Sequence, residues 1–142
     1  MRMVLDTNVL VSALITPGGL PDQLLQRWET GDFTLVTSAK QIDELDRVLA
    51  YEKLQRFIHR NQANRLVATI RHLAIVVEGL PTVTVSQDAD DNVILATAMA
   101  GGADQLVTGD KGHLLGLKQA GGVPIITVRQ AVELLDSEAA GG

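Results

Sequence analysis

The chain has 142 residues, of which 46% are hydrophobic, and its formal net charge is −5 at pH 7. This length and apolar content predict one globular domain with enough chain for a core, at residues 1–137, followed by a flexible tail at 138–142. The absence of cysteine excludes disulfides and thiolate metal sites. With no secretory signal pattern and no apolar run near the roughly 20 residues of a membrane helix, we expect a cytoplasmic protein without a membrane partner.

The charged residues are segregated along the sequence. Residues 53–77, here called the basic arm, contain five Lys or Arg residues and two His residues but no acid. A net negative charge alone argues against a nucleic-acid partner, because phosphate binding normally needs excess positive charge. The basic arm weakens that objection. The acids concentrate elsewhere, notably at Asp88, Asp90, Asp91, Asp104 and Asp110.

Apolar spacing in the first half of the chain predicts alternating strands and helices. Residues 3–5 form a short apolar run typical of a buried strand, and residues 7–14 have helical spacing. After a Pro-Gly break at 16–19, a helix is predicted at 20–28 and a strand at 33–37. Ser38 with Gln41 matches a capping box, which predicts a third helix to about Ala50.

The second half continues this pattern. Residues 54–75 predict one or two amphipathic helices, while the runs 75–77 and 83–85 are too short to be predicted as full sheet members. A buried helix is predicted at 93–100, a strand at 105–108, a helix at 111–119 and a last helix at 128–135. Residues 124–127 predict an edge strand, because Pro124 cannot donate to a ladder. The alternation indicates an α/β fold, a three-layer sandwich with a central parallel sheet.

Four acids are predicted to meet at one rim of that sheet. Asp6 and Asp110 each follow a strand, and parallel strands end at the same rim, where such sheets bind ligands. Asp91 precedes the buried helix at 93–100. Glu44 flanks the apolar stripe of the helix at 38–50, whereas Asp43 lies outside it.

Such a cluster of carboxylates stays ionised only if cations compensate it. Oxygen ligands without Cys or His favour Mg²⁺ or Mn²⁺ over zinc. The alternative is that each acid has an ordinary local role. Asp6 and Asp91 would then be helix caps, Asp110 a turn residue and Glu44 part of a solvated face.

The motifs together resemble a known family. The segments VLDTNVLVSAL, DADDNVILATAMAGGADQLVTGD and PIITVRQAVELL resemble PIN-domain ribonucleases, and more narrowly the toxins of bacterial type II toxin–antitoxin pairs. The fold that the resemblance implies is PIN-like and Rossmann-like. The family's four catalytic and metal-binding acids fall on Asp6, Glu44, Asp91 and Asp110, with Asp46 as the alternative to Glu44. Its polar helpers fall on Asn8, Thr108 and Asn92.

The resemblance implies a metal-dependent endoribonuclease that uses one or two Mg²⁺ or Mn²⁺ ions. In such a site the metal polarises the scissile phosphate and activates water, and the 3′ oxygen departs. It also implies an antitoxin that covers the acidic rim, and a homodimer. Single-stranded or looped RNA suits an open rim, and Arg56, Arg60 and Arg65 could follow its backbone. These arginines could equally be a solvated face or a dimer contact. Aromatic residues are only 3% of the chain, which argues against base stacking.

Two other functions remain open from the sequence. A phosphatase could use Asp6 as its nucleophile, but that class needs a second Asp two residues on, where this chain has Asn8. A metal-binding or interaction module without turnover is the other alternative.

Overall fold

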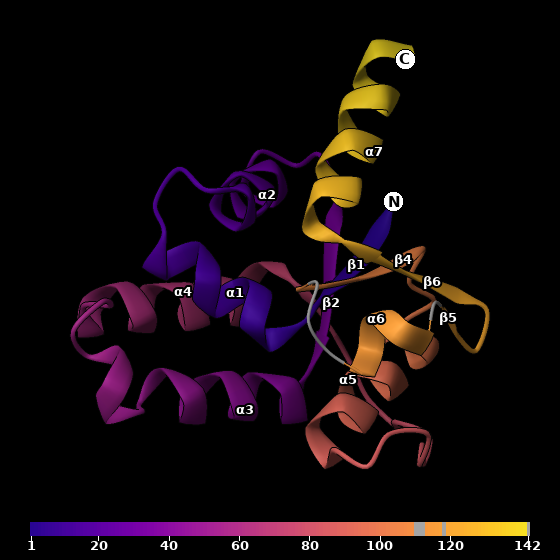
Figure 1. Cartoon of the computed structure of the whole chain (residues 1–142), viewed down its shortest axis with the longest axis horizontal. Coiled ribbons are helices and arrows are strands. Elements are labelled where there is room, and N and C mark those ends of the chain that lie inside the picture. The colour runs from indigo at the N-terminus through magenta and orange to yellow at the C-terminus, as the bar shows by residue number, and fades with distance from the viewer. Residues whose placement is uncertain (110–112, 118, 142) are drawn as a thin grey trace.

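The computed structural model describes residues 1–109, 113–117 and 119–141. Its first elements are β1 (Arg2–Leu5), α1 (Thr7–Ile15), α2 (Leu20–Glu29), β2 (Thr34–Ser38), α3 (Ala39–Leu49), the 3₁₀ turn η1 (Glu52–Leu54) and α4 (Arg60–Leu73). They are followed by β3 (Ile75–Val77), α5 (Ala89–Ala100), β4 (Gln105–Thr108), α6 (His113–Leu117), β5 (Gln119–Ala120), β6 (Val123–Thr127) and α7 (Val128–Gly141) (Figure 1).

The strands form one sheet in the order β3-β2-β1-β4-β6-β5. Five of them run parallel, and β5 pairs antiparallel with β6. In the centre, β1 pairs with β2 at Met3 and Leu35, and with β4 at Leu5 and Val107. The predicted α/β fold with a central parallel sheet is therefore confirmed.

Alternating side chains of the central strands enter two separate cores. Met3 and Leu5 of β1 belong to the core shared with α1, α2, α3, α4 and α7. Val4 points to the opposite face and joins the core shared with α5 and α6. Successive strand residues project to opposite faces, so a sheet covered on both sides needs apolar residues at every position. The result is the predicted three-layer sandwich (Figure 1).

The edges of the sheet differ from the prediction. Pro124 does not place β6 at the edge: β6 lies between β4 and β5, and Pro124 stands opposite Gln119. Because proline has no N–H to donate, it is compatible with the short two-residue pairing seen there. At the other edge β3 is a sheet member that pairs with β2, whereas residues 83–85 form no strand.

Two helix ends also differ from the prediction. Of the helix predicted at 111–119, residues 113–117 form α6 and residue 119 belongs to β5, while residues 111, 112 and 118 lie outside the described residues. The last helix continues through Gly141, so residues 138–141 of the predicted flexible tail are helical. The end of α7 extends away from the rest of the molecule (Figure 1).

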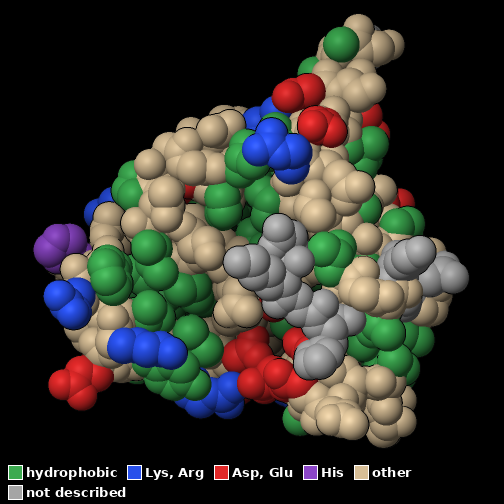
Figure 2. Space-filling view, in the orientation of Figure 1, with side chains coloured by type: hydrophobic (Ala, Val, Ile, Leu, Met, Phe, Trp, Pro, Cys, Tyr) green, Lys and Arg blue, Asp and Glu red, His purple; other side chains and the backbone are tan. Residues whose placement is uncertain are grey.

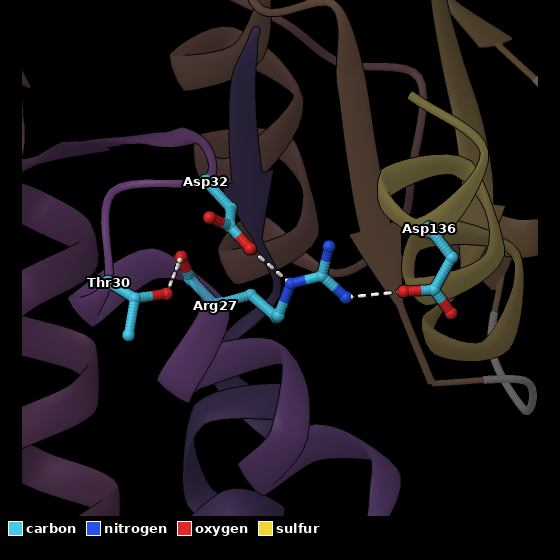
Figure 3. Close-up of polar contacts among 4 residues, drawn as sticks. All are labelled: Arg27, Thr30, Asp32 and Asp136. Atoms are coloured by element: carbon cyan, nitrogen blue, oxygen red, sulfur yellow. Dashed lines mark hydrogen bonds and ion pairs between the residues drawn. The ribbon is translucent and has the colours of Figure 1, made fainter. Parts of the chain in front are cut away.

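Arg27 links α2 to this helix through Asp136. Its Nη1 donates to Asp136 of α7 at 2.6 Å, and its Nε donates to Asp32 (Figure 3). The Thr30 hydroxyl donates to the Arg27 carbonyl at 3.2 Å, which holds the end of α2 in place. Within the described residues, no helix is both long and apolar enough to cross a membrane.

Candidate active site

Asp6 lies where β1 ends and α1 begins. Its backbone N–H donates to the Val107 carbonyl at 2.8 Å, which extends the β1–β4 pairing to the rim of the sheet. Its side chain is 8% exposed and accepts a hydrogen bond of 2.8 Å from the Thr108 hydroxyl at the end of β4. Asp6 occupies the N-cap position of α1, but among the described residues its carboxylate makes no capping hydrogen bond.

Glu44 approaches the same rim from α3. Ser38 caps this helix by accepting a hydrogen bond from the Gln41 N–H at 3.3 Å. The Gln41 side chain instead donates to the Leu5 carbonyl at 2.6 Å, so only half of the predicted capping box is formed. Glu44 is 9% exposed, and its Oε1 accepts a hydrogen bond from the Thr7 hydroxyl. The solvated-face alternative is thus wrong for Glu44. Asp43 and Asp46 are exposed, and Asp46 pairs with Arg71 at 3.1 Å.

Burial makes both carboxylates reluctant to ionise. Burial raises the pKa of Asp6, although the Thr108 hydroxyl and the backbone N–H groups of Asn8 and Thr7 lower it in part. Burial, followed by the charge of Asp90 and that of Asp6, raises the pKa of Glu44 to about 7 against the lowering effect of Thr7. Among the described residues, neither carboxylate forms an ion pair with Lys or Arg.

The start of α5 brings further acids to this region. Asp88 caps the helix and accepts a hydrogen bond from the Asp90 N–H at 2.9 Å. The helix therefore begins at Ala89. Asp91, which was predicted to precede the helix, lies in its first turn. Asp90 pairs with Arg47 of α3 at 2.9 Å and contributes to the raised pKa of Glu44. On this face of the molecule, acidic side chains gather between α3 and α5 (Figure 2).

Asn92 fixes the loop that precedes α5. Its Oδ1 accepts from the Ser86 N–H and its Nδ2 donates to the Ser86 carbonyl, both at 2.8 Å. The Ser86 hydroxyl in turn donates to Asp91 Oδ2 at 3.4 Å. Asn92 thus influences Asp91 through Ser86. Hydrogen bonds that orient a ligating carboxylate tune its affinity for metal.

The structure brings the predicted site residues together to different extents. Asp6, Glu44 and Thr108 lie at one buried corner, whereas the side chain of Asn8 is exposed and only its backbone N–H affects Asp6. Asp110 lies outside the described residues. Asp104, which had no assigned role, accepts a hydrogen bond from the Arg2 N–H at 2.7 Å and holds the other end of β1.

Sequence reasoning missed Thr7, Ser86, Asp88 and Asp90. Thr7 follows Asp6 directly in the sequence, and this hydroxyl next to a predicted site acid could have indicated its role. Asp88 carried the signal of a helix cap, since Asp is a preferred N-cap residue. No local pattern indicates that Asp90 would face Glu44, which is distant in the sequence.

The donor chemistry of this corner fits a divalent cation. Two buried carboxylates supply hard oxygen ligands, and their uncompensated charge is what a bound cation relieves. Within the part of the chain that the structure describes, no three His, Cys, Asp or Glu side chains form a ready metal-binding group. The fit therefore rests on the Asp6–Glu44 pair and on the oxygen donors around it.

The basic arm is mostly exposed. Arg56, Arg60 and Arg65 are exposed, and none of them forms an ion pair with a described residue. Arg71 differs, because it is engaged with Asp46 of α3. The three unpaired guanidinium groups remain available to an external anion.

Comparisons with known proteins agree with this architecture. Over 112 residues the chain is 27% identical to a protein of Methanocaldococcus jannaschii described as "Uncharacterized protein MJ1680", an alignment that covers 78% of this chain and 72% of that protein. No solved structure matches the chain. The model of the PIN domain matches residues 2–112, a span that includes β1, α3 and the start of α5. The chain therefore belongs to the PIN domain family, whose members are generally nucleases and typically use divalent metals.

Proposed function

We propose that this protein is a metal-dependent endoribonuclease that cleaves RNA phosphodiester bonds. The observation that carries the proposal is the buried pair of Asp6 and Glu44 at the carboxyl end of the central strands. Burial raises the pKa of both groups, and no described Lys or Arg pairs with them. In a chain of the PIN domain family, such a pair is best explained as ligands for a cation.

Asp6, Glu44, Asp91 and Asp110 would hold one or two Mg²⁺ or Mn²⁺ ions. A bound ion of this kind polarises a phosphate and lowers the pKa of bound water. The protein's own hydroxyl groups fix the ligands: Thr108 donates to Asp6, and Thr7 donates to Glu44. Each hydroxyl leaves a free lone pair on the carboxylate it orients, so both acids stay able to coordinate.

RNA is the proposed substrate, in single-stranded or looped form. Arg56, Arg60 and Arg65 are exposed and carry the positive charge that a phosphate backbone needs. Arg56 lies in the turn after η1, and Arg60 and Arg65 lie on α4, which packs against α3, the helix that carries Glu44. The overall charge of −5 is then a poor guide, because acids are concentrated where a cation would compensate them.

The proposal extends to a biological role as a toxin neutralised by a cognate antitoxin, with a homodimer as the active form. This part rests on the motif resemblance from Asp6 to Asn8 and from Asp88 to Asp110. Covering the acidic rim with another protein would block access to Asp6 and Glu44 together. Size-exclusion chromatography coupled to light scattering measures the oligomeric state of the purified protein.

The decisive experiment is incubation of the purified protein with defined RNAs, with and without Mn²⁺, followed by mapping of the cut ends. We expect cleavage that needs the metal and is lost in Asp6→Asn and Asp91→Asn. Asp43→Asn is the matched control, because it removes an exposed acid of α3 next to Glu44. Unchanged cleavage by Asp6→Asn would refute the site. Release of phosphate from small esters, with an acyl-phosphate on Asp6, would indicate a phosphatase instead.

A further inference from the structure

The turn between α3 and α4 exposes two aromatic side chains. The chain has only four aromatic residues, and Trp28 and Phe33 are buried in the core. Tyr51, in contrast, is 41% exposed and Phe57 is 59% exposed. Exposing an aromatic ring forfeits the large gain from burying it, so the surroundings of an exposed ring are where a ligand contact is sought.

An open groove lies beside Tyr51. It has a volume of about 790 Å³ and is lined by Tyr51, Glu52, Lys53, Gln55 and Arg56. The Lys53 ammonium lies 5.8 Å from the centre of the Tyr51 ring, within the range of a cation–π interaction. Two cations against one acid give the groove a net positive charge, and the next 21 residues add no acid. This groove is called the Tyr51 groove below.

The backbone of the Tyr51 groove is held in place before any ligand binds. The Leu54 N–H donates to the Tyr51 carbonyl at 3.0 Å, and the Gln55 N–H donates to the Glu52 carbonyl at 3.1 Å. The Gln55 side chain also donates to the Leu49 carbonyl at the end of α3, at 3.1 Å. A surface ordered in this way loses less entropy when it binds a partner.

Arg47 connects the groove to the candidate active site. It pairs with Asp90 at 2.9 Å, and Asp90 faces Glu44. On its other side Arg47 interacts with the Tyr51 side chain, which raises the pKa of the guanidinium. At the end of the molecule where α3 leads to α4, basic and hydrophobic side chains lie together with an acidic one, and the acidic cluster lies further along, toward α5 (Figure 2). The groove and the candidate site are thus joined through the contacts of Arg47.

We propose that the Tyr51 groove binds single-stranded RNA, with a base stacked on the Tyr51 ring and phosphates at Lys53 and Arg56. This inference rests on the proposed ribonuclease function and identifies where that substrate is held. Unpaired bases stack on aromatic side chains with little dependence on sequence, and cations follow the backbone. The low number of aromatic residues argued against stacking, but the exposure of Tyr51 beside Lys53 and Arg56 supports it. An acidic or neutral protein segment would leave the stacking surface of Tyr51 unexplained.

The test is a fluorescence-anisotropy titration with a labelled oligouridylate of about ten nucleotides, a length within the range of single-strand sites. EDTA is present so that no cleavage occurs. We expect Tyr51→Leu to weaken binding about tenfold and Tyr51→Phe, which keeps the ring, to bind as the unaltered protein does. In Lys53→Ala/Arg56→Ala, the slope of log K against log salt should become shallower by about 0.7 per lost phosphate contact. Tyr51→Leu should leave that slope unchanged.

The control is Arg2→Ala, which removes one positive charge at the start of β1, the end of that strand that lies away from Asp6. We expect it to bind the oligouridylate like the unaltered protein. A duplex RNA of the same length should bind more weakly, because its bases are already stacked. Equal affinity for the duplex, or unchanged binding in both Tyr51→Leu and Lys53→Ala/Arg56→Ala, would overturn the proposal.

Parallel cleavage assays with Mn²⁺ separate this inference from the proposed function. If the protein cleaves RNA but the groove variants bind and cleave normally, the Tyr51 groove is refuted and the ribonuclease function stands. If the protein binds the oligouridylate through the groove but never cleaves RNA with any divalent metal, the groove stands and the ribonuclease function is refuted.

Discussion

Glu44 makes the stability of the metal-free protein depend on pH. Its pKa is about 7 in the folded protein and near the ordinary value of 4.5 in the unfolded chain. Between these values the folded state binds more protons than the unfolded state, so stability falls as pH rises from about 4.5 to 7. The burial that raises the pKa of Asp6 acts in the same direction.

The variant Glu44→Gln should therefore lose less stability than the unaltered protein when the pH rises from 5 to 8 in EDTA. Glutamine keeps an acceptor for the Thr7 hydroxyl but carries no charge to desolvate. Thermal melts at both pH values measure the effect, and each kcal/mol moves the midpoint by roughly 2–4 °C in proteins near this size. Asp43→Asn, on the exposed face of α3, should follow the unaltered protein. Identical pH dependence for Glu44→Gln would contradict the assigned burial.

Thr108 should matter for metal binding more than for folding. Its hydroxyl donates to Asp6 at 2.8 Å, and Val has nearly the same shape without a donor. We expect Thr108→Val to lower Mn²⁺ affinity or cleavage by about 10- to 100-fold, as loss of a group that orients a metal ligand typically does. Calorimetric titration with Mn²⁺ and the cleavage assay measure this. The control Thr30→Val removes an exposed hydroxyl far from the site and should leave Mn²⁺ affinity and cleavage unchanged. Unaltered Mn²⁺ affinity and cleavage in Thr108→Val would show that Asp6 does not need the Thr108 hydroxyl to orient it.

At the level of elements, the C-terminal end of α5 packs closely against the sheet. A side chain at Gly101 would collide with Cγ1 of Val36 and lie 3.2 Å from Cγ1 of Val77. Val36 is fully buried in the core beneath α5, so it has little room to move.

Gly101→Ala should accordingly destabilise the protein by about 1–3 kcal/mol, the usual cost of overpacking. Chemical denaturation gives the difference in unfolding free energy. In a Val36→Ala background the same change should cost less, because the collision is removed; additive effects would argue against the contact. Gly116→Ala in α6 is the control, because among the described residues no atom beyond its own chain neighbours and helix backbone lies within 4 Å of the added carbon. We expect a neutral or slightly stabilising effect.

For the whole molecule, the two buried carboxylates of Asp6 and Glu44 predict stabilisation by divalent metal. A ligand that binds only the folded state at 100 times its dissociation constant adds about 2.7 kcal/mol. We expect Mn²⁺ to raise the melting temperature, and more at pH 8 than at pH 5, because the carboxylates must lose their protons to coordinate. Asp6→Asn should remove most of this shift. A melting temperature that does not move at millimolar Mn²⁺ would argue strongly against the site.

The sequence by itself determined the order of the elements and the position of Asp6. Apolar residues with a period of two or 3.6 mark strands and helices locally, so β1, α1, α3 and β4 were predictable. The same local rule placed Glu44 on the inner flank of α3, because a helix fixes the direction of each side chain. The edge position predicted from Pro124 was wrong, because the pairing of β6 with β5 decides it. The predicted start of α5 was wrong as well, because Asp88 caps the helix earlier in the chain.

Only the tertiary structure decided which side chains meet. Thr7 contacts Glu44, and Asp90 faces the same carboxylate, across separations in sequence that no periodic pattern encodes. The exposure of Tyr51 likewise depends on how the turn between α3 and α4 lies on the surface. Local patterns report the preferences of the backbone. Burial, pKa and the formation of a site depend instead on distances between segments, and those exist only once the chain has packed.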